Sequence, residues 1–263
     1  MSQPTTIRID RPAPAVARVS LARAEVRNAF NEIVIAELTQ AFRAFDADDS
    51  VRVVVLAAEG TAFCAGADLN WMRRMAGYTR DENLADAAAL AEMLRTIATC
   101  RKPTIARVQG DAYAGGMGLV AACDIAVAAD SAHFCLSEVK LGLIPATIGP
   151  YVVRAMGAHA AQRYFLTAER FDAATALRIG YLHEVAAAEQ LDAAVQGFVD
   201  AFLAASPEAL ASCKRLLQAI HSQPIDAVLI ARTAEFIADS RVSDDGRHGI
   251  QSFLGKAKPR WAG

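Results

Sequence analysis

The chain has 263 residues, 27 of them basic and 29 acidic, and its net charge of −2 is spread without a cluster of either sign. This distribution excludes the basic stripe that a nucleic-acid-binding protein needs. A hydrophobic fraction of 54% with 21% charged residues excludes extensive disorder and supports a core large enough to fold without disulfides or metal.

The first part of the chain alternates between strand-like and helix-like patterns. Residues 5–21 alternate apolar with polar side chains, as an opening strand or hairpin does. Asn31 precedes apolar residues at helical spacing over 33–48, which predicts a helix capped by this asparagine. The nearly all-apolar, β-branched run at 51–58 predicts a strand that is covered on both faces.

A loop at 59–70 and a long helix at about 82–100 follow, and Pro103 ends the helix. The same order then recurs as a strand at 104–108, a loop at 110–118, a helix at 119–123 and strands at 124–129 and 132–136. Repeated strand, loop and helix units predict a parallel sheet with crossover helices. From about residue 147 we find helical patterns alone, so we expect an α/β core followed by a mostly helical C-terminal third.

Targeting and metal-binding signals are lacking in the sequence. The opening residues MSQPTTIRIDRP have no apolar core of signal-peptide length, and no apolar run approaches the roughly 20 residues of a membrane span. The five cysteines form no CxxC pair, and the five histidines show no ligand spacing. We therefore expect a cytoplasmic protein with reduced thiols, no metal, and no membrane or nucleic-acid partner.

Two loops rich in Gly and Ala follow strands of the predicted sheet, at 58–72 and 109–124. Ligands collect at the carboxyl ends of parallel strands, and small residues let the backbone approach a ligand. The second loop enters a helix near Gly115 or Gly116, whose free N–H groups suit a developing negative charge. Either loop alone could be a tight turn, but two in succession favour a binding site. Neither carries the GxGxxG fingerprint of a dinucleotide site.

Glu138 is the candidate acid/base of this region. It follows the short strand predicted at 132–136 and has Ser137 and Val139 as neighbours. Apolar surroundings raise the pKa of a carboxyl group, which suits proton transfer near neutrality. From the residues alone, a helix cap or a surface ion pair with Lys140 explains this glutamate equally well.

Several segments together resemble the successive signatures of the crotonase (enoyl-CoA hydratase/isomerase) superfamily. In family order they are RAEVRNAF at 23–30, AFCAGADL at 62–69, GDAYAGGMGLVAACD at 110–124, SEVKLGLIP at 137–145 and FLGKAKPRW at 253–261. The resemblance covers about the whole chain and implies an α/β crotonase-like spiral of repeated ββα units. It implies a core with an acyl-CoA site at 1–200 and a helical region at 201–263 that oligomerises into trimers or hexamers.

The resemblance also implies roles for single residues. The backbone N–H groups of Ala65 and Gly115 would form an oxyanion hole for the thioester oxygen of an acyl-CoA, and Glu138 would be catalytic. The positions that match coenzyme A or substrate contacts are Arg27, Ala29, Gly66, Ala67, Asp68, Leu69 and Lys256. Lys256 would come from a neighbouring subunit in many members of the family. No cofactor is implied beyond the coenzyme A of the substrate.

One position departs from the family pattern. The best-known hydratases carry two glutamates, and Gly118 stands where the first would be. Hydration by Glu138, with a substrate carboxylate or another side chain orienting the water, is the first interpretation. The stretch at 137–157 resembles methylglutaconyl-CoA and isohexenylglutaconyl-CoA hydratases, whose substrates carry a second carboxylate, more than it resembles the short-chain hydratase. A Δ3-Δ2 enoyl-CoA isomerase with one glutamate and a non-catalytic acyl-CoA binder are the alternatives. Cys64 lies beside a predicted donor, but its neighbouring sequence offers no histidine to activate it.

Overall fold

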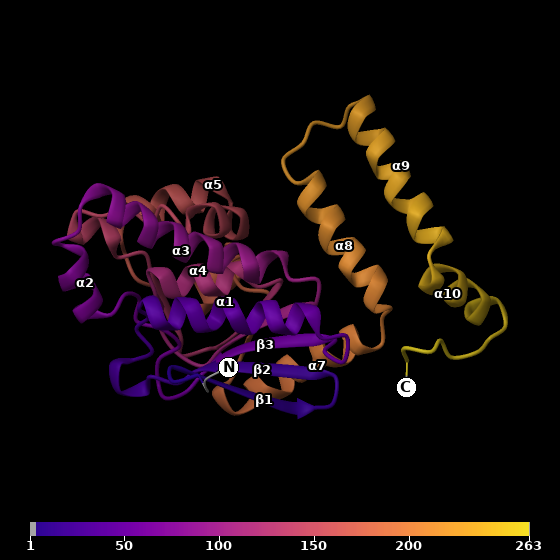
Figure 1. The fold of residues 1–263 in the computed structure, drawn as a ribbon, viewed down its shortest axis with the longest axis horizontal. Coiled ribbons are helices and arrows are strands. Elements are labelled where there is room, and N and C mark those ends of the chain that lie inside the picture. The colour runs from indigo at the N-terminus through magenta and orange to yellow at the C-terminus, as the bar shows by residue number, and fades with distance from the viewer. Residues whose placement is uncertain (1–3, 263) are drawn as a thin grey trace.

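The computed structural model describes residues 4–262 as an α/β fold with helices on both faces of a main sheet (Figure 1). In this part of the chain the main sheet has the strand order β1-β2-β3-β4-β6-β9, and a smaller one has the order β5-β7-β8. The strands are β1 Ile7–Ala13, β2 Val16–Leu21, β3 Val53–Ala58, β4 Thr104–Val108, β5 Ala112–Tyr113, β6 Ile125–Ala129, β7 His133–Cys135, β8 Phe171–Asp172 and β9 Glu184–Ala186.

The helices lie between and after these strands. They are α1 Glu32–Ala47, α2 Leu69–Met75, α3 Arg80–Thr99, α4 Gly115–Ala122, α5 Gly149–Thr167, α6 Ala173–Arg178, α7 Leu191–Leu203, α8 Pro207–Ile220, α9 Ala227–Val242 and α10 Asp244–Leu254. Short 3₁₀ helices are η1 Ala24–Val26, η2 Glu138–Leu141 and η3 Ala188–Gln190. The α/β architecture expected from the sequence is confirmed, including a helical C-terminal region.

The main sheet begins with the predicted hairpin. Strands β1 and β2 pair antiparallel, with Ile7 opposite Leu21, and every later neighbour in this sheet pairs in parallel. The expectation of helices alone after residue 147 is wrong, because β8 and β9 lie there. These strands have only two and three residues, too few to show a period of two, and they form by pairing with β7 and β6.

Strand β3 is buried on both faces, as its apolar run predicted. Val54 and Leu56 face the main core beneath α1, α3 and α4, whereas Val53 and Val55 face a second core. Helix α7 covers that second core with Leu191, Val195 and Val199. The alternation of side chains along the strand therefore divides one apolar run between two cores.

Local signals place the helix starts with mixed success. The side chain of Asn31 accepts the N–H groups of Ile33 and Val34 at 3.1 and 3.2 Å and caps α1 as predicted. Helix α4 begins at Gly115, where the second loop was expected to enter a helix, although the helical pattern itself was recognised only over 119–123. Its first turn, GGMG, is buried on all sides, so it carries no amphipathic pattern that would mark a helix.

Helices α8, α9 and α10 project from one end of the core (Figure 1), and α8 contacts α3 through the hydrogen bond from the Gln218 amide to the carbonyl oxygen of Ala98. Ser206 caps α8 ahead of Pro207. Within residues 4–262, α8 and α9 have no buried side chain. Large apolar side chains stay exposed in this region: Leu217, Ile225, Val228, Ile230, Ile237, Val242, Ile250, Phe253 and Leu254. None of the described helices is long and apolar enough to cross a membrane.

Candidate active site

Short extended segments bring the two glycine-rich loops and Glu138 into one region. Phe30 forms a parallel bridge with Ala67, and Cys64 forms another with Ala112. Strand β5 at 112–113 then pairs in parallel with β7, which ends three residues before Glu138. Segments from four parts of the sequence therefore lie side by side at the edge of the core.

The first loop does not offer the donor that the sequence suggested. The N–H of Ala65 donates to the carbonyl oxygen of Arg27 at 3.0 Å, so it is already used within the protein. The expectation that Ala65 supplies an oxyanion donor is therefore wrong for this structure. A backbone donor that is hydrogen-bonded inside the fold cannot also hold a thioester oxygen.

Ala67 has a free N–H donor in this loop. Phe30 donates its N–H to Gly66 at 2.9 Å and accepts the N–H of Asp68 at 3.0 Å. In a parallel bridge these two bonds flank Ala67, so its own N–H points away from Phe30. No acceptor for this N–H lies within residues 4–262. From the sequence, Ala67 was placed among the coenzyme A contacts. The sequence does not show which amide N–H groups of the loop are hydrogen-bonded within the protein and which stay free.

The second donor is the N–H of Gly115 at the first position of α4. Such a position has no partner inside its helix, and no other acceptor meets it in the described chain. Ala114 before it has φ 48° and ψ −122°, a conformation that alanine rarely adopts. Its N–H donates to the carbonyl of Cys135 at 2.8 Å, which holds the strained residue in place. Strain of this kind is typical of functional sites.

The two donor loops are in contact. A Cβ atom added to Gly66 would lie 3.1 Å from Cβ of Ala114 and 3.4 Å from the carbonyl oxygen of Tyr113. Tyr113 also donates its N–H to the carbonyl oxygen of Cys64 at 2.9 Å. Gly66 itself has φ +92°, which lets the chain turn between the bridges to Ala112 and Phe30.

Glu138 begins η2 directly beyond β7. Its Oε2 atom is buried and has no hydrogen-bond partner among the described residues. Burial raises the pKa of this carboxyl group above its ordinary value. The ion pair with Lys140 that the sequence left open does not form in the described structure, and the carboxylate caps no helix through its side chain.

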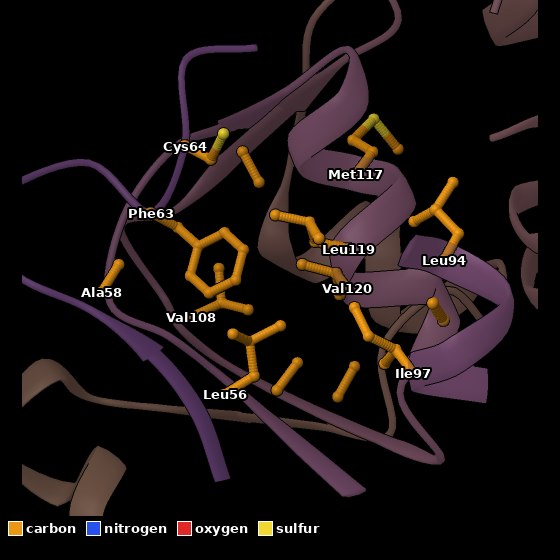
Figure 2. Packing of buried hydrophobic residues seen from close by; sticks show 14 of the residues in the cluster. Leu56, Ala58, Phe63, Cys64, Leu94, Ile97, Val108, Met117, Leu119 and Val120 are labelled. Carbon is orange, nitrogen blue, oxygen red and sulfur yellow. The ribbon is translucent and has the colours of Figure 1, made fainter. Parts of the chain in front are cut away.

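Ile148 occupies the place of the missing glutamate. A Cβ atom added to Gly118 would lie 2.2 Å from Cγ2 and 2.8 Å from Cβ of Ile148, and 3.6 Å from Cδ2 of Leu94. Figure 2 shows α4 packed between Leu94 and Ile97 on one side and Phe63 and Cys64 on the other. The glycine is therefore part of a close-packed apolar contact, with no room for a second carboxylate.

The remaining predicted contacts divide into exposed and structural residues. Asp68 is buried, and its carboxylate accepts hydrogen bonds from the Arg23 guanidinium at 2.7 Å and from the N–H groups of Asn70 and Trp71. Although burial opposes ionisation, these bonds hold the pKa of Asp68 below its usual value. Ala29 is buried as well. Arg27 and Leu69 are exposed beside the first loop and are free to meet a ligand.

Lys256 is not brought to this region of its own chain. It follows α10, which lies at the opposite end of the molecule from α2 and the first loop (Figure 1). A contact between Lys256 and a ligand at the loops would therefore need a second copy of the chain.

Cys64 lies beside the site but is unsuited to nucleophilic attack. The side chain is fully buried, and burial raises the pKa of its thiol to about 12. Among residues 4–262, no three His, Cys, Asp or Glu side chains gather as a metal site requires.

Sequence reasoning missed Phe30, Asn28 and Ile148 as site residues. Asn28 is buried with φ 55°, and its amide donates to the carbonyl oxygens of Glu59 and Ala62 at 2.7 and 2.9 Å. Asn28 and Phe30 both lie in the RNAF motif. The polar Asn28, which directly precedes two apolar residues, was the signal in the sequence that marks this segment. Nothing near Ile148 in the sequence indicates that it packs against Gly118.

Known proteins resemble this chain over nearly its whole length. The family model for enoyl-CoA hydratase/isomerase matches residues 12–263. The enoyl-CoA hydratase ACTT6 of Alternaria alternata is 36% identical over 250 residues, which cover 93% of this chain and 80% of that protein.

Solved structures are similar over nearly the whole chain. An enoyl-CoA hydratase from Shewanella pealeana is 45% identical with a TM-score of 0.95, covering 98% of this chain and 97% of that one. Pseudomonas aeruginosa AtuE is 33% identical with a TM-score of 0.93, covering 98% and 100%. The resemblance read from the sequence motifs is thus confirmed at the level of the superfamily. The chain belongs to the enoyl-CoA hydratase/isomerase family and is one of its enzymes.

Proposed function

We propose that the protein hydrates a 2-enoyl-CoA to a 3-hydroxyacyl-CoA with Glu138 as its single acid/base. The observation that carries this proposal is the unpartnered, buried Oε2 of Glu138 next to two backbone loops with free N–H groups. The names of the similar proteins, which are enoyl-CoA hydratases, support the same reaction.

The thioester oxygen would lie between the N–H groups of Ala67 and Gly115. Water attacks C3 as Glu138 takes a proton from it, and the electrons of the C2–C3 double bond move onto the thioester oxygen as an enolate. Glu138 then returns the proton to C2, and the enolate collapses to the saturated thioester. Each preorganised donor of this kind typically lowers a barrier by about 3–4 kcal/mol.

A raised pKa suits both steps assigned to Glu138. A more basic carboxylate removes a proton from water more readily, and its conjugate acid remains strong enough to protonate the enolate carbon. Because burial is the largest cause of the shift, closing the site around an acyl group would reinforce it.

Isomerisation of a 3-enoyl-CoA is the second candidate. The contact between Gly118 and Ile148 favours it, because a proton shuttle from C2 to C4 needs one carboxylate and no bound water. The same two donors would hold the dienolate.

The substrate itself belongs to the proposal. The likeness of residues 137–157 to methylglutaconyl-CoA and isohexenylglutaconyl-CoA hydratases supports an acyl group with a second carboxylate. Such a carboxylate could orient the water that a second glutamate orients in other members. Coenzyme A would enter as part of the substrate and meet the exposed Arg27 and Leu69.

A homotrimer, alone or stacked as a hexamer, completes the proposed site. The exposed apolar side chains of α8, α9 and α10 support association of this region. Lys256 would then reach coenzyme A on a neighbouring copy.

The test is a substrate panel given to the purified protein. Crotonyl-CoA, a longer 2-enoyl-CoA, a 3-enoyl-CoA and 3-methylglutaconyl-CoA would be followed by mass spectrometry and by absorbance of the conjugated thioester. A product heavier by one water supports hydration. An unchanged mass with the double bond moved into conjugation supports the isomerase instead.

Glu138→Gln is the matched control for this panel. We expect it to lower kcat by about 10²–10⁴-fold, the usual contribution of a positioned acid/base. If no ester is converted although esters bind, both catalytic proposals fail and an acyl-CoA binder remains.

A further inference from the structure

Phe30 contacts both of the loops that carry the free N–H donors. It is 2% exposed and lies in the segment between η1 and α1. Its main chain and its ring meet different loops.

The main chain of Phe30 holds the first donor. Its N–H donates to Gly66 at 2.9 Å, and its carbonyl accepts the N–H of Asp68 at 3.0 Å. These bonds lie on either side of Ala67 and fix the plane of the peptide that carries its N–H. The segment is held in turn by Asn28, whose side chain is bonded to the carbonyls of Glu59 and Ala62.

The ring of Phe30 limits the position of the second donor. A Cβ atom added to Gly115 would lie 2.2 Å from Cζ and 2.5 Å from Cε1 of this ring. The first residue of α4 is therefore in direct contact with the ring tip, and it has no side chain that could take up a gap. Trp71 packs against the ring with centroids 5.8 Å apart and keeps it from rotating away.

We propose that Phe30 is a positioning residue that sets the separation of the Ala67 and Gly115 N–H groups. This inference rests on the proposed function, because it assigns those groups to the thioester oxygen. The backbone of Phe30 fixes one donor, and the length of its ring fixes how closely the other approaches. Oxyanion donors act through exact placement, so a side chain that spaces them controls the rate without touching the substrate.

Phe30→Leu removes the ring tip and keeps both backbone bonds to the first loop. The start of α4 can then shift toward the gap, helped by relaxation of the strained Ala114. A misplacement of about 1 Å can cost about 10²-fold in rate, so we expect kcat to fall roughly 10- to 100-fold with KM nearly unchanged.

Phe42→Leu is the matched control. Phe42 is also fully buried, but it pairs with Phe45 on α1 and does not meet either donor loop. It removes the same atoms from the core, so a loss due to reduced stability alone would appear in both variants. We expect Phe42→Leu to keep the kcat of the wild type.

The second readout is the carbonyl stretch of bound butyryl-CoA with a ¹³C-labelled thioester, measured by difference infrared spectroscopy. This saturated ester is not hydrated, so the measurement needs no turnover. Polarisation by two donors lowers the stretching frequency in the wild type and in Phe42→Leu. In Phe30→Leu it should return part of the way toward its value in water. Phe30→Val, which also lacks the ring tip, serves the same comparison if the leucine variant does not stay folded.

A rescue variant tests the spacing directly. Gly115→Ala alone should clash with the ring, whereas Phe30→Leu with Gly115→Ala refills the gap and should regain part of the lost kcat. Unchanged kcat and carbonyl frequency in Phe30→Leu would overturn the inference, and so would equal losses in Phe42→Leu. If the wild type lowers the carbonyl stretching frequency of bound butyryl-CoA but neither hydrates nor isomerises any ester, the proposed function is contradicted. The role of Phe30 is then still tested by the infrared measurement.

Discussion

Glu138 is a carboxylate that loses water on folding and gains no partner for Oε2. Such an atom costs the folded state free energy, because burial favours the neutral form. The fold nevertheless holds it three residues beyond Cys135, whose carbonyl oxygen accepts the N–H of the strained Ala114. Stability given up at one residue in this way is typical of a group kept for chemistry.

The burial of Glu138 predicts the pH dependence of stability in Glu138→Gln. A carboxyl group whose pKa is higher in the folded than in the unfolded protein destabilises the folded protein once it is ionised. This penalty disappears below pH 4.5, the ordinary pKa of a glutamate, because the group is then protonated in both the folded and the unfolded protein. We expect the variant to melt at a higher temperature than the wild type at pH 8, with the difference shrinking toward pH 4. Thermal melts across this range measure it.

Glu92→Gln gives the opposite sign as a control. Hydrogen bonds from Arg95 and Arg43 lower the pKa of Glu92 to about 2, so its charge supports the folded state at neutral pH. That variant should melt no higher than the wild type at pH 8. Equal melting temperatures for Glu138→Gln and wild type at every pH would refute the burial argument.

Close packing at Gly118 makes a second prediction. Gly118→Ala should cost about 1–3 kcal/mol of unfolding free energy, because the new methyl overlaps Ile148. In an Ile148→Ala background the same change should be nearly harmless. At Gly197 in α7 an added Cβ atom would have no atom of a neighbouring element within 4 Å. Gly197→Ala should therefore be neutral or stabilising by up to about 1 kcal/mol. Chemical denaturation of the four variants decides whether the space at Gly118 is filled.

At this scale the sequence predicted which side chains matter better than which amides do. Glu138 and Gly115 could be named because a carboxylate and a helix start leave marks in the sequence. Ala65 donates its own N–H to Arg27, whereas Phe30 bonds to the residues on either side of Ala67 and leaves its N–H free, and this difference depends on contacts between distant segments. Ile148 could not be found for the same reason.

The loop before α2 is braced by a largely buried ion pair. Arg23 and Asp68 are 17% and 9% exposed at their side chains, with 2.7 Å between Nη2 and Oδ2. The same carboxylate caps α2 through the N–H groups of Asn70 and Trp71. The pair therefore ties the segment after β2 to the residue that follows Ala67.

Asp68→Ala should destabilise the protein far more than loss of a helix cap alone. Leaving Arg23 unpaired in a mostly buried position costs about 3–5 kcal/mol. Asp226→Ala, which removes the cap of α9 and no ion pair, should cost about 1 kcal/mol. If urea denaturation shows equal losses of unfolding free energy in Asp68→Ala and Asp226→Ala, the ion pair between Arg23 and Asp68 contributes nothing to stability.

Elements with strong local signals could be predicted from the sequence. Asn31 before α1 and the apolar run of β3 are sufficient in themselves. The helical pattern of α4 was recognised only in its second half, and strands β8 and β9 were missed, because their form depends on tertiary packing. A buried GGMG turn has no polar face, and a strand of two or three residues has no period.

The exposed apolar side chains of the C-terminal helices matter at the scale of the whole molecule. Phe253 and Ile225 are 82% and 87% exposed, and neither α8 nor α9 contains a buried residue. Large exposed apolar side chains on three successive helices are typical of a surface that associates with another chain. Light scattering should therefore give a mass of three or six times the 28.0 kDa of one chain. A monomeric mass at micromolar concentration would contradict the proposed assembly.

Subunit complementation tests whether Lys256 acts across that interface. Lys256→Ala should raise KM for the acyl-CoA, and Glu138→Gln should abolish turnover. Oligomers reassembled from a mixture of the two variants would contain sites with both residues intact, so activity should exceed that of either variant. A mixture no more active than Lys256→Ala alone, at equal concentration of that chain, would place Lys256 outside the site.

The central claim is that Glu138 alone moves the proton between water and C2. The direct measurement is hydration of a 2-enoyl-CoA in deuterated, ¹⁸O-labelled water, with the product analysed by mass spectrometry. The account predicts one solvent oxygen at C3 and one deuterium at C2 in the wild type, with both incorporations lost together in Glu138→Gln. Deuterium that still enters C2 in that variant would show that another group transfers the proton, and the single-carboxylate mechanism would fall.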